Sequence, residues 1–110
     1  MRQILFDELT REDLAKLEGR LREFATPSLV EGLYWIEAPR DLLDPGQYEA
    51  EADQPFCFAV ELGDGWVKFE LLIRSLANMR SCQVRYAGAA QQKFILDLAT
   101  RLVEELGLMT

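Results

Sequence analysis

The side chains best able to do chemistry gather in one short stretch, residues 37–53. It reads EAPRDLLDPGQYEAEAD, and its six acids against one base give a net charge of −5. The whole chain carries −7, which leaves only −2 for all the other residues together. Carboxylates at this density can hold a cation or attract a basic protein.

Three of these acids have the spacing that begins a calcium-binding loop. Glu49, Glu51 and Asp53 stand at alternate positions, like the first three ligands of an EF-hand. That loop also needs a glycine directly after the third ligand and a glutamate at its twelfth position. Gln54 and Val60 occupy those places, so we expect no metal site here.

The same stretch can instead be a helix that binds a partner. Residues 44–47, DPGQ, offer a capping aspartate, a proline at the first helical position and a glutamine at the third. We therefore predict a short helix over about residues 45–52. A solvated helix explains the same charges without any partner. The candidate partner-binding residues are Tyr48, Glu49, Glu51 and Asp53.

The sequence contains no recognisable motif for acid–base or nucleophilic catalysis. The chain has no histidine, the usual proton carrier near neutral pH, and two cysteines, Cys57 and Cys82. Two cysteines alone do not complete a structural zinc site. Strand alternation puts them on opposite faces of non-adjacent strands, too far apart for a disulfide. We expect no catalytic residue, no cofactor and reduced thiols.

Basic side chains gather later in the chain. Residues 68–93 hold five bases and one acid, a net charge of +4. Alternation places Lys68, Arg74 and Arg85 on one face of the predicted sheet, and together they could bind a carboxylate or phosphate. Cross-strand pairing with nearby glutamates explains the same cations without a ligand.

Two amphipathic helices can be predicted from apolar residues at helical spacing. The first begins after Thr10, which can form a capping box with Asp13, and ends before Pro27. Glu18 and Arg22 are spaced to pair on its exposed face. The second helix runs from Gly88 to about residue 106. Its apolar arc is wide enough to contact the first helix or a second copy as well as the sheet.

Strands are predicted at residues 33–37, 56–62, 67–73 and 80–86, where apolar and polar residues alternate. Residues 63–65, GDG, form the turn of a hairpin between the second and third. The expected fold class is α+β: an antiparallel sheet of about four strands, with the N- and C-terminal helices packed on one face. The 37–55 connector then carries the short helix, and residues 1–110 make a single domain.

Composition narrows the function. No apolar run reaches the ~18 residues that cross a bilayer, and the N-terminus turns acidic too early for a signal peptide. We therefore expect a cytosolic protein. A net charge of −7 argues against binding nucleic acid or an anionic membrane. These features favour a non-enzymatic protein–protein interaction module (an adaptor, a chaperone-like or a neutralising protein) that binds itself or a basic partner. The alternative is a small-molecule binder or enzyme that recognises an anion on the arginine-bearing sheet face.

Overall fold

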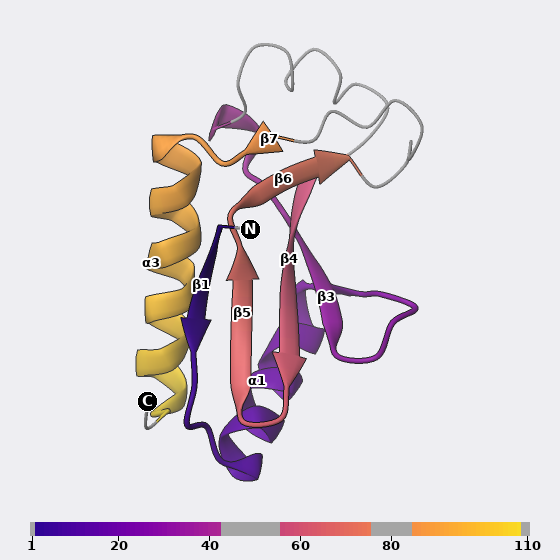
Figure 1. Cartoon of the computed structure of the whole chain (residues 1–110), viewed down its shortest axis with the longest axis vertical. Coiled ribbons are helices and arrows are strands. Elements are labelled where there is room, and N and C mark those ends of the chain that lie inside the picture. The colour runs from indigo at the N-terminus through magenta and orange to yellow at the C-terminus, as the bar shows by residue number, and fades with distance from the viewer. Residues whose placement is uncertain (1, 43–55, 76–84, 109–110) are drawn as a thin grey trace.

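The computed structural model describes residues 2–42, 56–75 and 85–108, and the statements below concern these residues (Figure 1). The α+β class is confirmed. The elements in chain order are β1 (Gln3–Phe6), α1 (Arg11–Phe24), β2 (Thr26–Pro27), β3 (Leu33–Glu37), a 3₁₀ turn (Arg40–Leu42), β4 (Phe56–Gly63), β5 (Trp66–Glu70), β6 (Leu72–Ser75), β7 (Arg85–Tyr86) and α3 (Ala89–Leu106). The helix predicted over residues 45–52 falls outside the described residues.

The strands form an antiparallel sheet in the order β1-β5-β4-β3-β2, and β6 pairs with the far end of β4. The two-residue β7 pairs with β6. The prediction of about four strands was too low, because β1 and β2 were not anticipated. Of the predicted strand over residues 80–86, the described part is β7.

The predicted hairpin between β4 and β5 is confirmed. Gly63 pairs with Trp66, so the loop is the two residues Asp64 and Gly65. Gly65 has φ +83°, a backbone conformation that glycine adopts without steric cost. The backbone N–H of Leu9 donates to the Gly65 carbonyl at 2.9 Å, which ties the start of α1 to this turn.

The strand predicted through residues 67–73 is interrupted, and this is a correction. Between the pairs Val60–Phe69 and Cys57–Arg74, β4 advances by three residues while its partner advances by five. Two residues of the second strand are therefore extra, as in a β-bulge. Because the number of extra residues is even, odd-numbered residues face the core on both sides of the break.

Leu71 lies at this interruption, and its backbone bonds to other parts of the chain. Its N–H donates to the carbonyl of Arg2 at 3.0 Å, and its carbonyl accepts from Ala87 at 2.9 Å. The bend between β5 and β6 thus holds both the start of β1 and the segment that leads into α3.

One core cluster joins the two helices to one face of the sheet. From β4 it takes Phe58 and Val60, from α1 Leu21, and from α3 Ile95. Phe58 also meets the ring of Phe94 edge to face, with centroids 6.3 Å apart. Among the described residues, the buried members of this cluster are Leu9, Leu17, Leu21, Ala25, Tyr34, Ile36, Ala38, Phe56, Phe58, Val60, Val67, Phe69, Ile73, Ala87, Ile95, Ala99, Leu102 and Leu108.

The helices contact each other, which is one of the two contacts predicted from the wide apolar arc of α3. An ion pair joins Arg20 of α1 to Glu105 of α3 at 3.2 Å. The capping box is also confirmed: the Thr10 hydroxyl accepts from the Asp13 N–H at 3.0 Å, and the Asp13 carboxylate accepts from the Thr10 N–H at 3.1 Å. Neither helix of the described part has the length and apolar content to span a membrane.

Candidate functional site

The sequence placed a partner-binding surface in the connector, and that prediction remains open. Tyr48, Glu49, Glu51 and Asp53 all lie outside the described residues. The structure describes the chain on either side of them, up to the 3₁₀ turn at Arg40–Leu42 and again from the start of β4.

Two of the three predicted anion-binding residues, Lys68 and Arg74, belong to the face of the sheet opposite the core, which we call the outer face. Lys68 lies there on β5, with its ammonium 4.5 Å from the centre of the Trp66 ring. Arg74 lies there on β6 and donates to the Glu70 carboxylate at 3.0 Å. Its guanidinium also approaches the Trp35 ring, at 5.5 Å. Both cations therefore already have partners within the chain.

Two details of the outer face bear on ligand binding. The Nε of Arg74 is buried and has no hydrogen-bond partner among the residues that the structure describes. Arg85 stands opposite Ile73 in the register of β6 and β7, and its side chain is outside what the structure describes. The sheet thus brings two of the three predicted cations onto one face, while the third is untested.

The adjacent aromatics of β3 divide between the two faces, as alternation requires. Tyr34 is buried in the core, and Trp35 is half-buried on the outer face. Cys57 and Ala59 of β4, which also point outward by alternation, are buried. Trp35 stands opposite Ala59 and Arg74 opposite Cys57, so large side chains neighbour these two small residues on this face.

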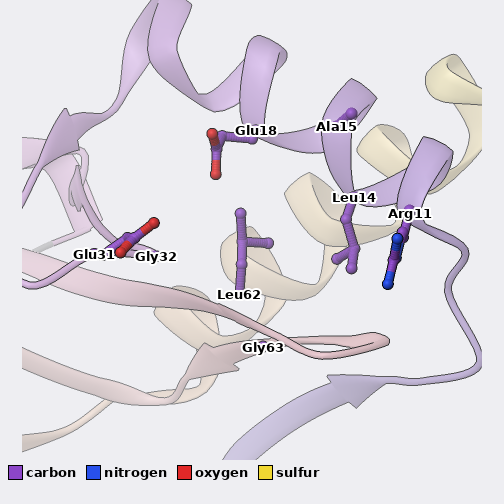
Figure 2. A pocket seen from close by; sticks show the side chains of 8 residues that line it. All are labelled: Arg11, Leu14, Ala15, Glu18, Glu31, Gly32, Leu62 and Gly63. Atoms are coloured by element: carbon purple, nitrogen blue, oxygen red, sulfur yellow. The ribbon is translucent and has the colours of Figure 1, made fainter.

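A second candidate site is a hollow of about 500 Å³ between α1, the loop before β3 and the end of β4 (Figure 2). We call it the α1 groove. Glu18 and Glu31 lie at one end of it and Arg11 at the other, with the apolar side chains of Leu62 and Leu14 between them. The residues that line it are Arg11, Leu14, Ala15, Glu18, Glu31, Gly32, Leu62 and Gly63.

The α1 groove exists because the loop before β3 is held tightly against β4. Gly32 has φ +82°, and its carbonyl accepts from the Leu62 N–H at 2.8 Å. A Cβ at position 32 would lie 2.9 Å from the Leu62 carbonyl oxygen, closer than side chains tolerate. Glycine is therefore required at this position both by its conformation and by the close approach, and it places Glu31 at the rim.

The charges of the α1 groove are only partly paired. Glu18 accepts from Arg22 at 2.8 Å. Arg22 also donates to the hydroxyl of buried Tyr34, and that hydrogen bond, with the charge of Glu18, raises the pKa of Arg22. Glu31 and Arg11 form no ion pair with any residue that the structure describes.

The hollow continues beyond Glu18 and Glu31. A neighbouring cavity of about 370 Å³ shares these two residues and Gly32 and extends along β3 to Tyr34. Val30 also lines this cavity and is exposed, like Leu29 beside it. The combined surface has an apolar floor and lip with carboxylates in the middle, which suits an extended segment rather than a compact small molecule.

Sequence reasoning identified the Glu18–Arg22 pair but not the α1 groove. Comparison with known proteins adds no family: neither protein-family models, nor curated proteins, nor solved structures gave a match. Among the described residues, no three Asp, Glu or Cys side chains gather as a metal site would require. Function must therefore be argued from the geometry of this surface.

Proposed function

We propose that this chain is a non-enzymatic protein-binding module that holds a basic, partly apolar segment of a partner protein. The observation that carries the proposal is the α1 groove, whose leucine floor ends between Glu18 and Glu31. A lysine or arginine side chain has matching chemistry: an apolar stem that packs on leucine and a cationic end that pairs with carboxylate.

The charge of the whole molecule supports the same partner. A net charge of −7 attracts a basic segment from a distance and speeds its association. The acidic connector, with Tyr48, Glu49, Glu51 and Asp53, adds to this attraction, and we propose it as a second contact for the same partner. An adaptor, a chaperone-like protein and a neutralising protein would all use such a surface.

The test uses two labelled peptides of equal length, one alternating leucine with arginine and the other leucine with glutamate. Fluorescence anisotropy should show binding of the arginine peptide alone. Glu31→Lys should weaken that binding by about tenfold or more, because it puts a cation where the peptide's own cation must sit. No binding of the arginine peptide to the unmodified chain would overturn the proposal.

Glu104→Lys is the matched control. Glu104 is exposed on α3, does not line the α1 groove, and its substitution changes the net charge by the same amount. Both variants weaken long-range attraction equally, so a larger loss in Glu31→Lys reports the groove itself. Equal losses would show that only the overall charge matters and that the α1 groove is not the site.

A second candidate function is recognition of an anion on the outer face. One observation favours it: the Nε of Arg74 is buried and, within the described part of the chain, has no hydrogen-bond partner, so a bound oxyanion could accept from it. The Nη2 of the same guanidinium already donates to the Glu70 carboxylate. The outer face is therefore a less accessible site for a ligand than the α1 groove.

A further inference from the structure

The two edges of the sheet differ in how well they are closed. One edge is β2, which has only two residues, one of them Pro27 without a backbone N–H. The other is β1, which within the described residues pairs with β5 alone and lies at the margin of the sheet in Figure 1. Proline and short length are devices that block further strand pairing, so β2 is protected and β1 is not.

The hydrogen bonds of β1 show which backbone groups point away from the sheet. The carbonyl of Arg2 points toward the β5 side of the strand, where it accepts a hydrogen bond from the N–H of Leu71. Because antiparallel strands alternate, Ile4 and Phe6 also direct their backbone groups toward β5. Gln3 and Leu5 therefore present their N–H and C=O groups at the open edge.

The side chains of β1 leave this edge suited to pairing. Its sequence, QILF, has no charge, no proline and no bulge. Ile4 and Phe6 pack against the core, whereas Leu5 lies opposite Lys68 on the outer face and is 49% exposed. Burying a half-exposed leucine on an uncharged edge strand would be energetically favourable, because it removes apolar surface from water.

We propose that β1 pairs with β1 of a second copy of this chain, antiparallel and related by a two-fold axis. Arg2 precedes the strand and two acids, Asp7 and Glu8, follow it, so an antiparallel copy brings the basic end of each strand to the acidic end of the other. Both the complementary charges at the two ends of β1 and its apolar residues therefore favour a second copy of this chain as the binding partner.

The outward backbone groups restrict the register. Residues with outward groups must face each other, so an odd-numbered residue pairs with an odd-numbered one. Placing the axis at Leu5 puts the two copies of this residue opposite each other and covers the exposed apolar side chain. Gln3 then faces Asp7 of the second copy, and Ile4 faces Phe6. This proposal uses neither the α1 groove nor the connector and is independent of the function proposed above.

Sedimentation or light scattering measures the consequence directly. The unmodified chain should be a dimer, and Leu5→Lys should raise the dimer dissociation constant by roughly tenfold or more, because two like charges would face each other. Leu96→Lys on α3 is the matched control, since Leu96 is equally exposed at 48%, and it should leave the dimer intact. Circular dichroism checks that both variants fold.

A cross-linking experiment tests the register. Directly opposed residues in a hydrogen-bonded pair have Cα atoms about 5.5 Å apart, within disulfide range, so Leu5→Cys should give a covalent dimer on mild oxidation. In the same register the two copies of residue 3 are about 14 Å apart, so Gln3→Cys should not. The unmodified chain controls for Cys57 and Cys82.

Three results would overturn the inference. The first is that the chain is a monomer at every concentration, even if that monomer binds a strand of another protein at β1. The second is a dimer that survives Leu5→Lys unchanged or is lost on Leu96→Lys instead. The third is cross-linking through position 3 but not through position 5, which would exclude the stated pairing.

Discussion

At the scale of single residues, the glycines of this chain divide into those that the fold requires and those that it tolerates. Gly32 has a positive φ and lies against the backbone of β4, whereas a Cβ added at Gly19 in the middle of α1 would meet open space. We expect Gly32→Ala to lower the free energy of unfolding by about 1–2 kcal/mol from the backbone conformation alone, and further from the contact with Leu62.

Gly19→Ala is the opposite case and serves as the control. It should raise the free energy of unfolding by roughly 0.5–1 kcal/mol, because alanine restricts the unfolded chain and nothing obstructs its Cβ. Urea denaturation of both variants measures the pair. A stable Gly32→Ala protein would mean that the loop before β3 can move away from β4, and the α1 groove would then lack a fixed wall.

At the scale of elements, α1 depends on its capping box. Thr10 and Asp13 exchange two hydrogen bonds that satisfy backbone and side-chain groups at the helix start. We expect Thr10→Ala to cost about 1 kcal/mol of stability, measured by urea denaturation, while Thr10→Ser keeps most of it. If serine were no better than alanine, the cap would contribute through something other than the hydroxyl.

At the scale of the whole molecule, the net charge separates the two candidate functions. A chain of charge −7 should bind the arginine peptide less well as salt is added, because ions screen the attraction. It should gain no thermal stability from inorganic phosphate or small carboxylates. A clear rise in melting temperature with phosphate, lost on Arg74→Ala, would instead favour the anion site on the outer face.

Elements with strong local signals could be predicted from the sequence. The capping box at Thr10 and Asp13, the extent of α3 to Leu106, and the turn at Asp64–Gly65 all depend on residues close together in the chain. The division of Tyr34 and Trp35 between the two faces follows from strand alternation. In each case the physical cause acts over only a few residues.

Features made by pairing distant segments were not predicted. The four residues of β1 carry no turn signal, and they form a strand only because β5 lies beside them. Nothing in the alternation of residues 67–73 marks the break at Leu71, whose backbone groups are taken by Arg2 and Ala87. Both depend on hydrogen-bond partners that the local sequence does not specify.

The sequence by itself determined the helices, the hairpin and the acidic character of this protein, because each follows from neighbouring residues or from the sum of charges. Only the tertiary structure decided the α1 groove and the open edge. Arg11, Glu18 and Glu31 read individually as solvated surface charges, and they become one site when α1 and the loop before β3 are held against β4. Sites of this kind depend on contacts between segments far apart in sequence, and those contacts form only in the folded chain.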